Sequence, residues 1–300
     1  GGRQAEFSRA GGVAISRAVL DVLLVDRAVA AGAEFRARTA AAVAGVEGDG
    51  WRVRLRSGEA ERSVTAGLVV AADGLNGGSL SELGAFSAQV SSRSWFGVGG
   101  VVVSRRAGPE RGAVEMNVGR HGYVGLVRLS DGTLNVAAAL DPAWTKRVGG
   151  PAAAIGAVLE EAGAPALDLR ASRLTGTAHL TRRRASVAVP GVLVVGDAAG
   201  YVEPFTGEGM SWALAGAAGA AGMVNAGAHG EELAAAWSRW HASRVQSRQR
   251  VCTAVRLVLR RPVLVRALLG VIGAVPAAAR AAEGVARRVE RPYSADGVTA

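Results

Sequence analysis

Residues 190–210 read PGVLVVGDAAGYVEPFTGEGM, and this stretch decides the fold. The apolar run 192–195 is short and uninterrupted, a pattern typical of a buried strand. It leads into Gly196 and Asp197, so the carboxylate is expected at the carboxyl end of a strand, where open α/β sheets bind ligands. Gly196 allows close approach to the backbone. An ionised carboxylate at this place accepts hydrogen bonds from sugar-like hydroxyl groups.

The residues that follow predict a helix N-terminus beside this strand end. Gly207, Glu208 and Gly209 open a long helix rich in alanine and glycine. The unpaired N–H groups of a helix N-terminus favour negative charge. Glu208 is interpreted as an acidic residue of the first turn rather than a proton relay. Asp197 and this helix therefore predict a binding site that combines an acceptor with backbone donors.

A second apolar run, 68–72, ends in Asp73 and Gly74. It has the same form as the run before Gly196, a short buried strand that feeds a turn. We expect the two runs to lie in one buried sheet, with Asp73 and Asp197 near its carboxyl edge.

Helix and strand patterns alternate along the remaining chain, which predicts a mixed α/β fold. Residues 18–31 form an amphipathic pattern whose apolar side, including Val19, Leu23 and Leu24, is expected to face inward. Asp131 and Gly132 mark a hairpin turn. Helices are expected at 151–162 and after 231, and strands at 51–55, 95–103, 114–118, 123–129 and 134–140.

The composition excludes several function classes. The chain has 300 residues, a net charge of +10 and a single cysteine, Cys252, so it is globular and has no internal disulfide framework. Its four histidines have no metal-ligand spacing, and no metal site is expected. Residues 231–300 hold twelve arginines and five acidic residues, among them Arg256 and Arg260, which are expected on outward helix faces. We expect no nucleic-acid partner, no peripheral membrane contact and a cytoplasmic protein.

The sequence of residues 196–214, GDAAGYVEPFTGEGMSWAL, resembles the second FAD-binding motif of the para-hydroxybenzoate hydroxylase-like flavoproteins. Within them it is most similar to the branch that holds geranylgeranyl reductases and flavin-dependent halogenases. The resemblance implies FAD as cofactor. It also implies cofactor contacts by the motif residues Gly196, Asp197, Pro204, Gly207, Glu208, Gly209 and Met210.

Two further segments resemble the same family. Arg17, in Ile15-Ser-Arg17, is similar to the arginine that contacts the FAD ribose and pyrophosphate. Asp73 and Gly74 resemble the family's Asp-Gly motif near the pyrophosphate, although the serine and arginine that usually follow are absent. The family's opening strand–GxGxxG–helix unit is also absent. We therefore expect the chain to lack about 30 residues or more that precede it in the family.

The resemblance implies a Rossmann-like FAD-binding domain that lacks its first βαβ unit, an inserted antiparallel-sheet substrate domain and C-terminal helices. The expected bounds are 1–85 and 181–230 for the FAD-binding domain, 86–180 for the substrate-side sheet and 231–300 for the helical region. Tyr123 matches part of a geranylgeranyl reductase signature, whereas its Trp and Phe-Pro are absent.

The expected function is that of a FAD-dependent oxidoreductase or monooxygenase acting on an apolar small molecule. NAD(P)H or another donor reduces the flavin, and the outcome is either hydroxylation with O₂ or reduction of a C=C bond. One alternative is an inactive fragment or a non-catalytic binding module. Another is a halogenase-like enzyme, which needs an active-site lysine; Lys146 is the only lysine here. The sequence identifies no catalytic residue, substrate, electron donor or oligomeric state.

Overall fold

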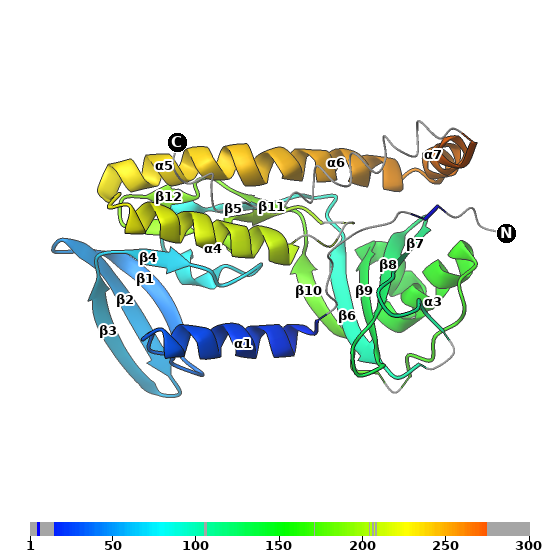
Figure 1. Cartoon of the computed structure of the whole chain (residues 1–300), viewed down its shortest axis with the longest axis horizontal. Helices are drawn as coiled ribbons and strands as arrows, with labels where there is room; N and C mark the ends of the chain where they lie inside the picture. The colour runs from blue at the N-terminus through cyan, green and yellow to red at the C-terminus, as the bar shows by residue number, and fades with distance from the viewer. Residues whose placement is uncertain are drawn as a thin grey trace. The chain divides into compact units, whose positions relative to one another are not determined.

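The computed structural model describes residues 5–6, 15–104, 107–170, 172–203, 205, 207 and 209–274. They form two compact units. Unit 1 comprises the described parts of 1–36, 94–179 and 257–283, and unit 2 those of 37–93 and 180–256. Both units mix helices with sheets, and the predicted α/β fold is confirmed (Figure 1).

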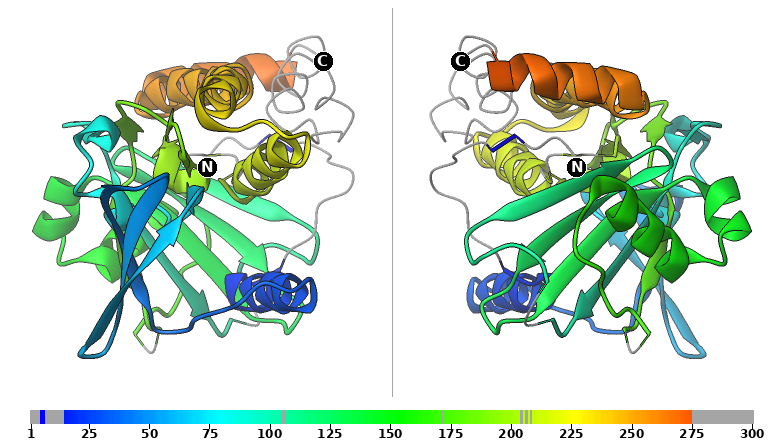
Figure 2. Two further views of the ribbon diagram at one scale, coloured as in Figure 1. Left: turned by 90° about the vertical axis from the view of Figure 1, so that its left-hand side faces the viewer. Right: turned by 90° about the vertical axis from the view of Figure 1, so that its right-hand side faces the viewer.

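Unit 1 is built on a five-stranded antiparallel sheet in the order β10-β6-β9-β8-β7. Helix α3 covers one face of this sheet, and side chains such as Val98, Val136 and Ile155 form the core between them (Figure 2). The expected turn at Asp131 and Gly132 joins β8 to β9, and Asp131 accepts hydrogen bonds from Thr133. The elements of unit 1 are α1 (Arg17–Ala30), β6 (Phe96–Val102), β7 (Val114–Gly119), β8 (Gly122–Arg128), β9 (Leu134–Leu140), α2 (Pro142–Arg147), α3 (Pro151–Ala162), β10 (Thr175–His179) and α7 (Pro262–Ala274).

Unit 2 contains three small sheets. Strands β1 (Ala40–Glu47), β2 (Gly50–Ser57) and β3 (Ala60–Ala66) form an antiparallel sheet in that order. The second sheet has the order β14-β11-β5, and the third the order β12-β13-β4. The bounds are β4 (Val69–Ala71), β5 (Ala88–Val90), β11 (Arg182–Arg184), β12 (Ala188–Val189), β13 (Val192–Val194) and β14 (Gly200–Tyr201).

The third sheet confirms the pairing expected from the two apolar runs. Strands β4 and β13 are parallel neighbours, with Val69 opposite Val192 and Ala71 opposite Val194. Leu193 and Val194 are fully buried. Because parallel strands end at the same edge of a sheet, the turns that follow β4 and β13 lie at one edge of this sheet.

Three consecutive helices complete unit 2: α4 (Gly209–Asn225), α5 (Gly230–His241) and α6 (Ser247–Leu259), with a single π-helical segment at Ala242–Gln246 between the last two. Close packing explains the glycines of α4: a Cβ at Gly219 would lie 2.9 Å from the ring of Trp240. Short 3₁₀ turns occur at Gly78–Leu80, Gly84–Phe86 and Gly196–Ala199. Within the part of the chain that the structure describes, no helix is long and apolar enough to span a bilayer.

Two expectations about helix faces are wrong. In α1 the side chains of Val19, Leu23 and Leu24 are 52%, 51% and 44% exposed, because within unit 1 this helix has no face packed against a core. Arg256 and Arg260 are half-buried rather than outward. The guanidinium of Arg260 lies 4.3 Å from the ring centre of Trp95, a cation–π contact that periodicity alone does not reveal.

Candidate functional site

The turn after β13 has a geometry that only glycine adopts easily. Gly196 has φ +59°, and a Cβ built on it would lie 3.3 Å from the Cβ of Ala213 in α4. A side chain at this position would strain the backbone and press on the helix. Asp197 follows in the first position after this turn, half-buried, at the carboxyl end of the strand as the sequence predicts.

The carboxylate of Asp197 lies beside the beginning of α4. A Cβ on Gly209, the first residue of α4, would lie 3.7 Å from Asp197 Oδ1 and 3.4 Å from the ring of Tyr201. Gly207 has φ +78° and is exposed, with no atom near its Cβ position. Met210, in the first turn of α4, is 39% exposed. The structure thus brings an acceptor and a glycine-opened helix N-terminus together, whereas Pro204 and Glu208 lie outside the described residues.

Tyr201 is the residue near this site that sequence reasoning overlooked. Burial raises the pKa of its phenol well above the usual value, and the negative charges of Asp197 and Glu203 raise it further. The phenol therefore stays protonated at every physiological pH. Its only sequence signal is its place in the motif, four residues after Asp197.

The Asp73–Gly74 turn after β4 lies at the same edge of the sheet as the Gly196–Asp197 turn after β13. Asp73 is exposed, and its Oδ2 accepts a hydrogen bond from the backbone N of Ser79 at 2.7 Å. This bond closes the loop 73–79, in which Gly74 has φ +72° with open space around its Cβ position. Backbone of this kind permits a ligand to approach without a side-chain collision.

Arg17 belongs to unit 1, and the structure does not place it relative to the turns of unit 2. It is the first residue of α1, after the N-cap Ser16, whose side chain accepts a hydrogen bond from Val19 N. The Arg17 guanidinium is exposed and makes an i,i+4 ion pair with Asp21 at 3.1 Å. Its predicted contact with the cofactor stays a prediction.

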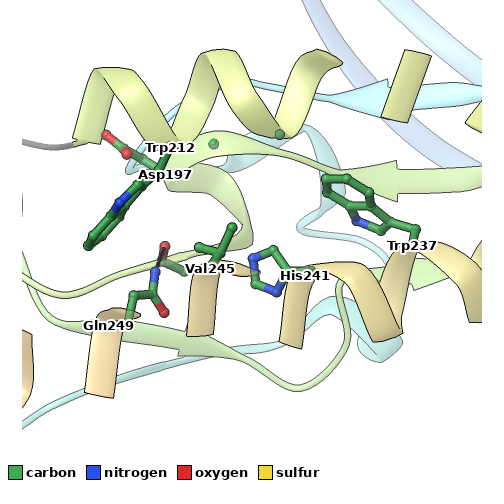
Figure 3. Close-up of a pocket in the computed structure, with 9 residues that line it drawn as sticks. Asp197, Trp212, Trp237, His241, Val245 and Gln249 are labelled. Atoms are coloured by element: carbon green, nitrogen blue, oxygen red, sulfur yellow. Dashed lines mark hydrogen bonds between the residues drawn. The ribbon is translucent and has the colours of Figure 1, made fainter. Parts of the chain in front are cut away.

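A small cavity lies beneath the Gly196–Asp197 turn. It has a volume of about 10 Å³, room for one water molecule. Helices α4, α5 and α6 contribute Trp212, His241 and Gln249 to its lining, as Figure 3 shows. Gln249 Nε2 donates to the carbonyl of Gly200 at 3.0 Å, which ties α6 to the turn.

His241 and Trp212 are buried in this cavity without hydrogen bonds from the described residues. They are 2% and 4% exposed, and the two ring nitrogens of His241 and the indole N–H of Trp212 have no partner. Burial lowers the pKa of His241 to about 4, so the ring is neutral near pH 7. Sequence reasoning missed this cluster, because a lone histidine and tryptophan on separate helices leave no spacing signal.

The residues at this edge of the sheet fit a flavin dinucleotide. Asp197 supplies an ionised acceptor for polyol hydroxyls, and the first turn of α4 supplies backbone donors for an anionic edge. Gly207 and Gly74 leave open the spaces that a Cβ would fill. Among the described residues, no group of three or more His, Cys, Asp or Glu side chains is arranged to hold a metal ion.

A parallel strand pair whose two following turns carry Asp73 and Asp197 at its carboxyl edge, with Asp197 beside a helix N-terminus, is the arrangement expected of a FAD-binding domain. The chain belongs to the FAD binding domain family, whose sequence pattern matches residues 13–254. No curated protein matches the chain in sequence.

Solved structures share the fold at low identity. The flavin-dependent brominase Bmp2 is 16% identical, with a TM-score of 0.71 over 95% of this chain and 72% of that chain. OxyS anhydrotetracycline hydroxylase from Streptomyces rimosus is 19% identical, with a TM-score of 0.66 over 93% of this chain and 58% of that chain. The p-nitrophenol 4-monooxygenase PnpA from Pseudomonas putida DLL-E4 is 17% identical, with a TM-score of 0.63 over 92% of this chain and 71% of that chain. The flavin-dependent halogenase CmlS is matched over 44% of its length.

Proposed function

We propose that the protein is a FAD-dependent monooxygenase that hydroxylates an apolar small molecule. Its overall reaction converts substrate C–H, O₂, NAD(P)H and a proton into substrate C–OH, water and NAD(P)⁺. The observation that carries the proposal is the juxtaposition of the Asp197 carboxylate with the glycine-opened N-terminus of α4. FAD, when bound, supplies the electron transfer and oxygen activation of this chemistry.

The chain's own groups bind and orient the cofactor. The Asp197 carboxylate would accept hydrogen bonds from hydroxyls of the ribityl chain, and charge-assisted bonds of this kind are about twice as strong as neutral ones. The N–H groups at the start of α4 favour the negative charge of a reduced flavin. Tyr201 keeps its proton because burial raises its pKa, so the phenol adds no negative charge of its own beside Asp197.

One face of the sheet in unit 1 suits an apolar substrate. Gly99, Ala137, Gly125 and Met116 lie opposite one another across β6, β9, β8 and β7. Their immediate neighbours in sequence, such as Val98 and Leu126, face the core under α3, so this row faces away from α3. Ala137 is exposed, and a Cβ on Gly99 would have only Val136 O within 4 Å. Met116 covers Gly125, where a Cβ would lie 2.9 Å from its Sδ, so the part of this row open to a flat apolar molecule is at Gly99 and Ala137.

The position of Lys146 favours hydroxylation over halogenation. A halogenase needs a lysine in its active site, whereas Lys146, the only lysine of this chain, lies exposed in the last turn of the short helix α2. Two of the proteins with the same fold are named a hydroxylase and a 4-monooxygenase, and two others a brominase and a halogenase, so the fold itself does not choose between these reactions. Reduction of a C=C bond, the reaction of the geranylgeranyl reductases, is the second candidate because Tyr123 matches part of their signature.

The test begins with FAD itself. Purified protein that includes the family's opening strand–GxGxxG–helix unit is titrated with FAD, and binding is followed by flavin fluorescence and by absorbance after gel filtration. Consumption of NADH or NADPH and of O₂ is then measured with a panel of apolar aromatic and prenyl substrates, in the presence and absence of bromide. We expect FAD binding and products that carry one ¹⁸O atom from ¹⁸O₂.

Each other outcome identifies an alternative. Protein that binds no FAD refutes the proposal. Protein that binds FAD but consumes no reduced nicotinamide is the non-catalytic module. Brominated products show a halogenase, and saturated prenyl products without oxygen uptake show a reductase.

A further inference from the structure

Three consecutive arginines form the short strand β11, and their side chains have different surroundings. Arg182 and Arg184 are half-buried, whereas Arg183 between them is exposed. This alternation follows from the strand period of two. Strand β11 lies between β14 and β5, with Arg183 opposite Gly200 on one side and Gln89 on the other. One face of β11 therefore carries two guanidinium groups into the interior of unit 2.

Arg184 joins three segments that are far apart in the sequence. Its Nη2 donates to the carbonyl of Gly77 at 3.0 Å, in the loop that begins at Asp73. Its Nη1 donates to the carbonyl of Phe86 at 2.6 Å. Its Nε donates to the carbonyl of Ala198, the residue after Asp197. One side chain therefore donates hydrogen bonds to the backbone of both the loop that begins at Asp73 and the turn that contains Asp197.

A second arginine and a glycine complete this arrangement. Arg182 Nη1 donates to the carbonyl of Leu75, in the same loop as Gly77. Gly77 has φ +51°, and a Cβ on it would collide with Arg184 Nη2. A side chain at this position would therefore strain the backbone and displace the guanidinium. Burial lowers the pKa of Arg184, and the negative charge of Asp73 opposes this shift.

We propose that Arg184 is a positioning residue of the cofactor site, which holds the Asp73–Gly74 loop and the Asp197 turn in their ligand-binding arrangement. This inference rests on the proposed function, because it concerns the same site. An arginine suits the role, since its planar fork directs several N–H donors along fixed and different directions. Lysine keeps the charge but has a single donor atom, which cannot reach three separate carbonyls in this way.

Hydrogen exchange of the protein without added FAD tests the positioning directly. We compare the wild type with Arg184→Lys and, as a matched control on the same strand, Arg183→Lys. Loss of bonds from a charged donor is expected to speed amide exchange in both 74–79 and 196–200 by about tenfold. The control is expected to leave both segments unchanged. Unchanged exchange at either turn in Arg184→Lys overturns the proposal.

A general loss of stability needs a separate control. Leu233→Ala removes buried side-chain volume from α5, which packs on β12 and β13 of unit 2. It is expected to lower the unfolding midpoint while the exchange of 74–79 and 196–200 stays at the wild-type rate. If Arg184→Lys fails to fold, ¹⁵N NMR of the wild type replaces the exchange comparison. Slow exchange of the Arg184 Nε proton supports the positioning role of Arg184, and exchange at the rate of a solvent-exposed guanidinium overturns it.

The consequence for the cofactor is measured independently. Arg184→Lys is expected to weaken FAD binding about tenfold and, at saturating FAD, to shift the flavin reduction potential, because the donors at the start of α4 no longer face a fixed Asp197 turn. Leu233→Ala and Arg183→Lys are expected to change neither quantity. If Arg184→Lys binds FAD with the wild-type affinity and shows the wild-type flavin reduction potential, Arg184 has no role in the cofactor site. Absence of FAD binding in the wild type refutes the proposed function, while the exchange experiment still decides whether Arg184 positions the turns.

Discussion

The buried histidine beneath the Asp197 turn makes stability depend on pH. His241 is 2% exposed, and burial lowers its pKa from 6.5 to about 4. The unfolded chain therefore binds a proton between these two values that the folded chain does not bind. Protons favour the unfolded state in this window, so the free energy of unfolding falls as pH decreases from 6.5 to 4 and the effect levels off below 4. The full effect amounts to about 3 kcal/mol.

The assay is urea unfolding at a series of pH values between 4 and 8, in the wild type and in His241→Phe. Phenylalanine keeps a ring beside Trp237, which contacts His241 at a centroid distance of 6.0 Å, but it cannot be protonated. Carboxylates titrate in both proteins, so the difference between the two curves isolates His241. We expect the wild type to lose about 3 kcal/mol more than the variant on acidification.

Three results would refute this reasoning. Parallel stability curves for the two proteins would show that His241 is not kept neutral by burial. A direct NMR titration of the His241 ring with a midpoint near 6.5 would lead to the same conclusion. Steeper acid loss in His241→Phe than in the wild type would reverse the sign and show that the protonated ring stabilises the fold.

Three further predictions concern the same part of unit 2. Asp197→Asn is expected to weaken FAD binding by about 1–3 kcal/mol, because it removes an ionised acceptor while keeping the shape; an unchanged dissociation constant in a fluorescence titration contradicts it. Gly196→Ala is expected to destabilise the protein by about 1–3 kcal/mol in urea unfolding, through strain at φ +59° and contact with Ala213. Trp237→Phe removes the indole donor of a buried 3.1 Å bond to the carbonyl of Val194, and a cost of about 1–3 kcal/mol is expected; a smaller change would mean that water replaces the indole.

A row of small residues on the sheet of unit 1 provides a test of substrate binding. Ala137→Leu places a large side chain on the exposed row that also contains Gly99, with little effect on the core under α3. We expect a higher KM for bulky apolar substrates and an unchanged FAD affinity. Val136→Ala, on the opposite face, is the matched control and is expected to lower stability instead. Equal KM values in Ala137→Leu and the wild type would move the substrate site elsewhere.

The sequence by itself determined the local elements and the chemistry of the ligand edge. The helix predicted at 151–162 has these bounds in the structure, and the strand pair β4 and β13 lies where its two apolar runs indicated. Such features are local: a run of apolar residues that ends in Asp and Gly carries its own strand, turn and acceptor. The place of Asp197 at a strand end and before a helix could therefore be predicted from adjacent residues alone.

Only the tertiary structure decided which distant groups act together. The bonds from Arg184 reach carbonyls up to 107 positions away, and the cavity around His241 is assembled from three helices and a turn. Neither leaves a periodic signal, because a carbonyl acceptor is the same at every residue and a buried histidine has no spacing partner. The exposed apolar face of α1 has the same cause: an amphipathic pattern shows that a helix has an apolar side, while burial depends on what the rest of the chain places against it.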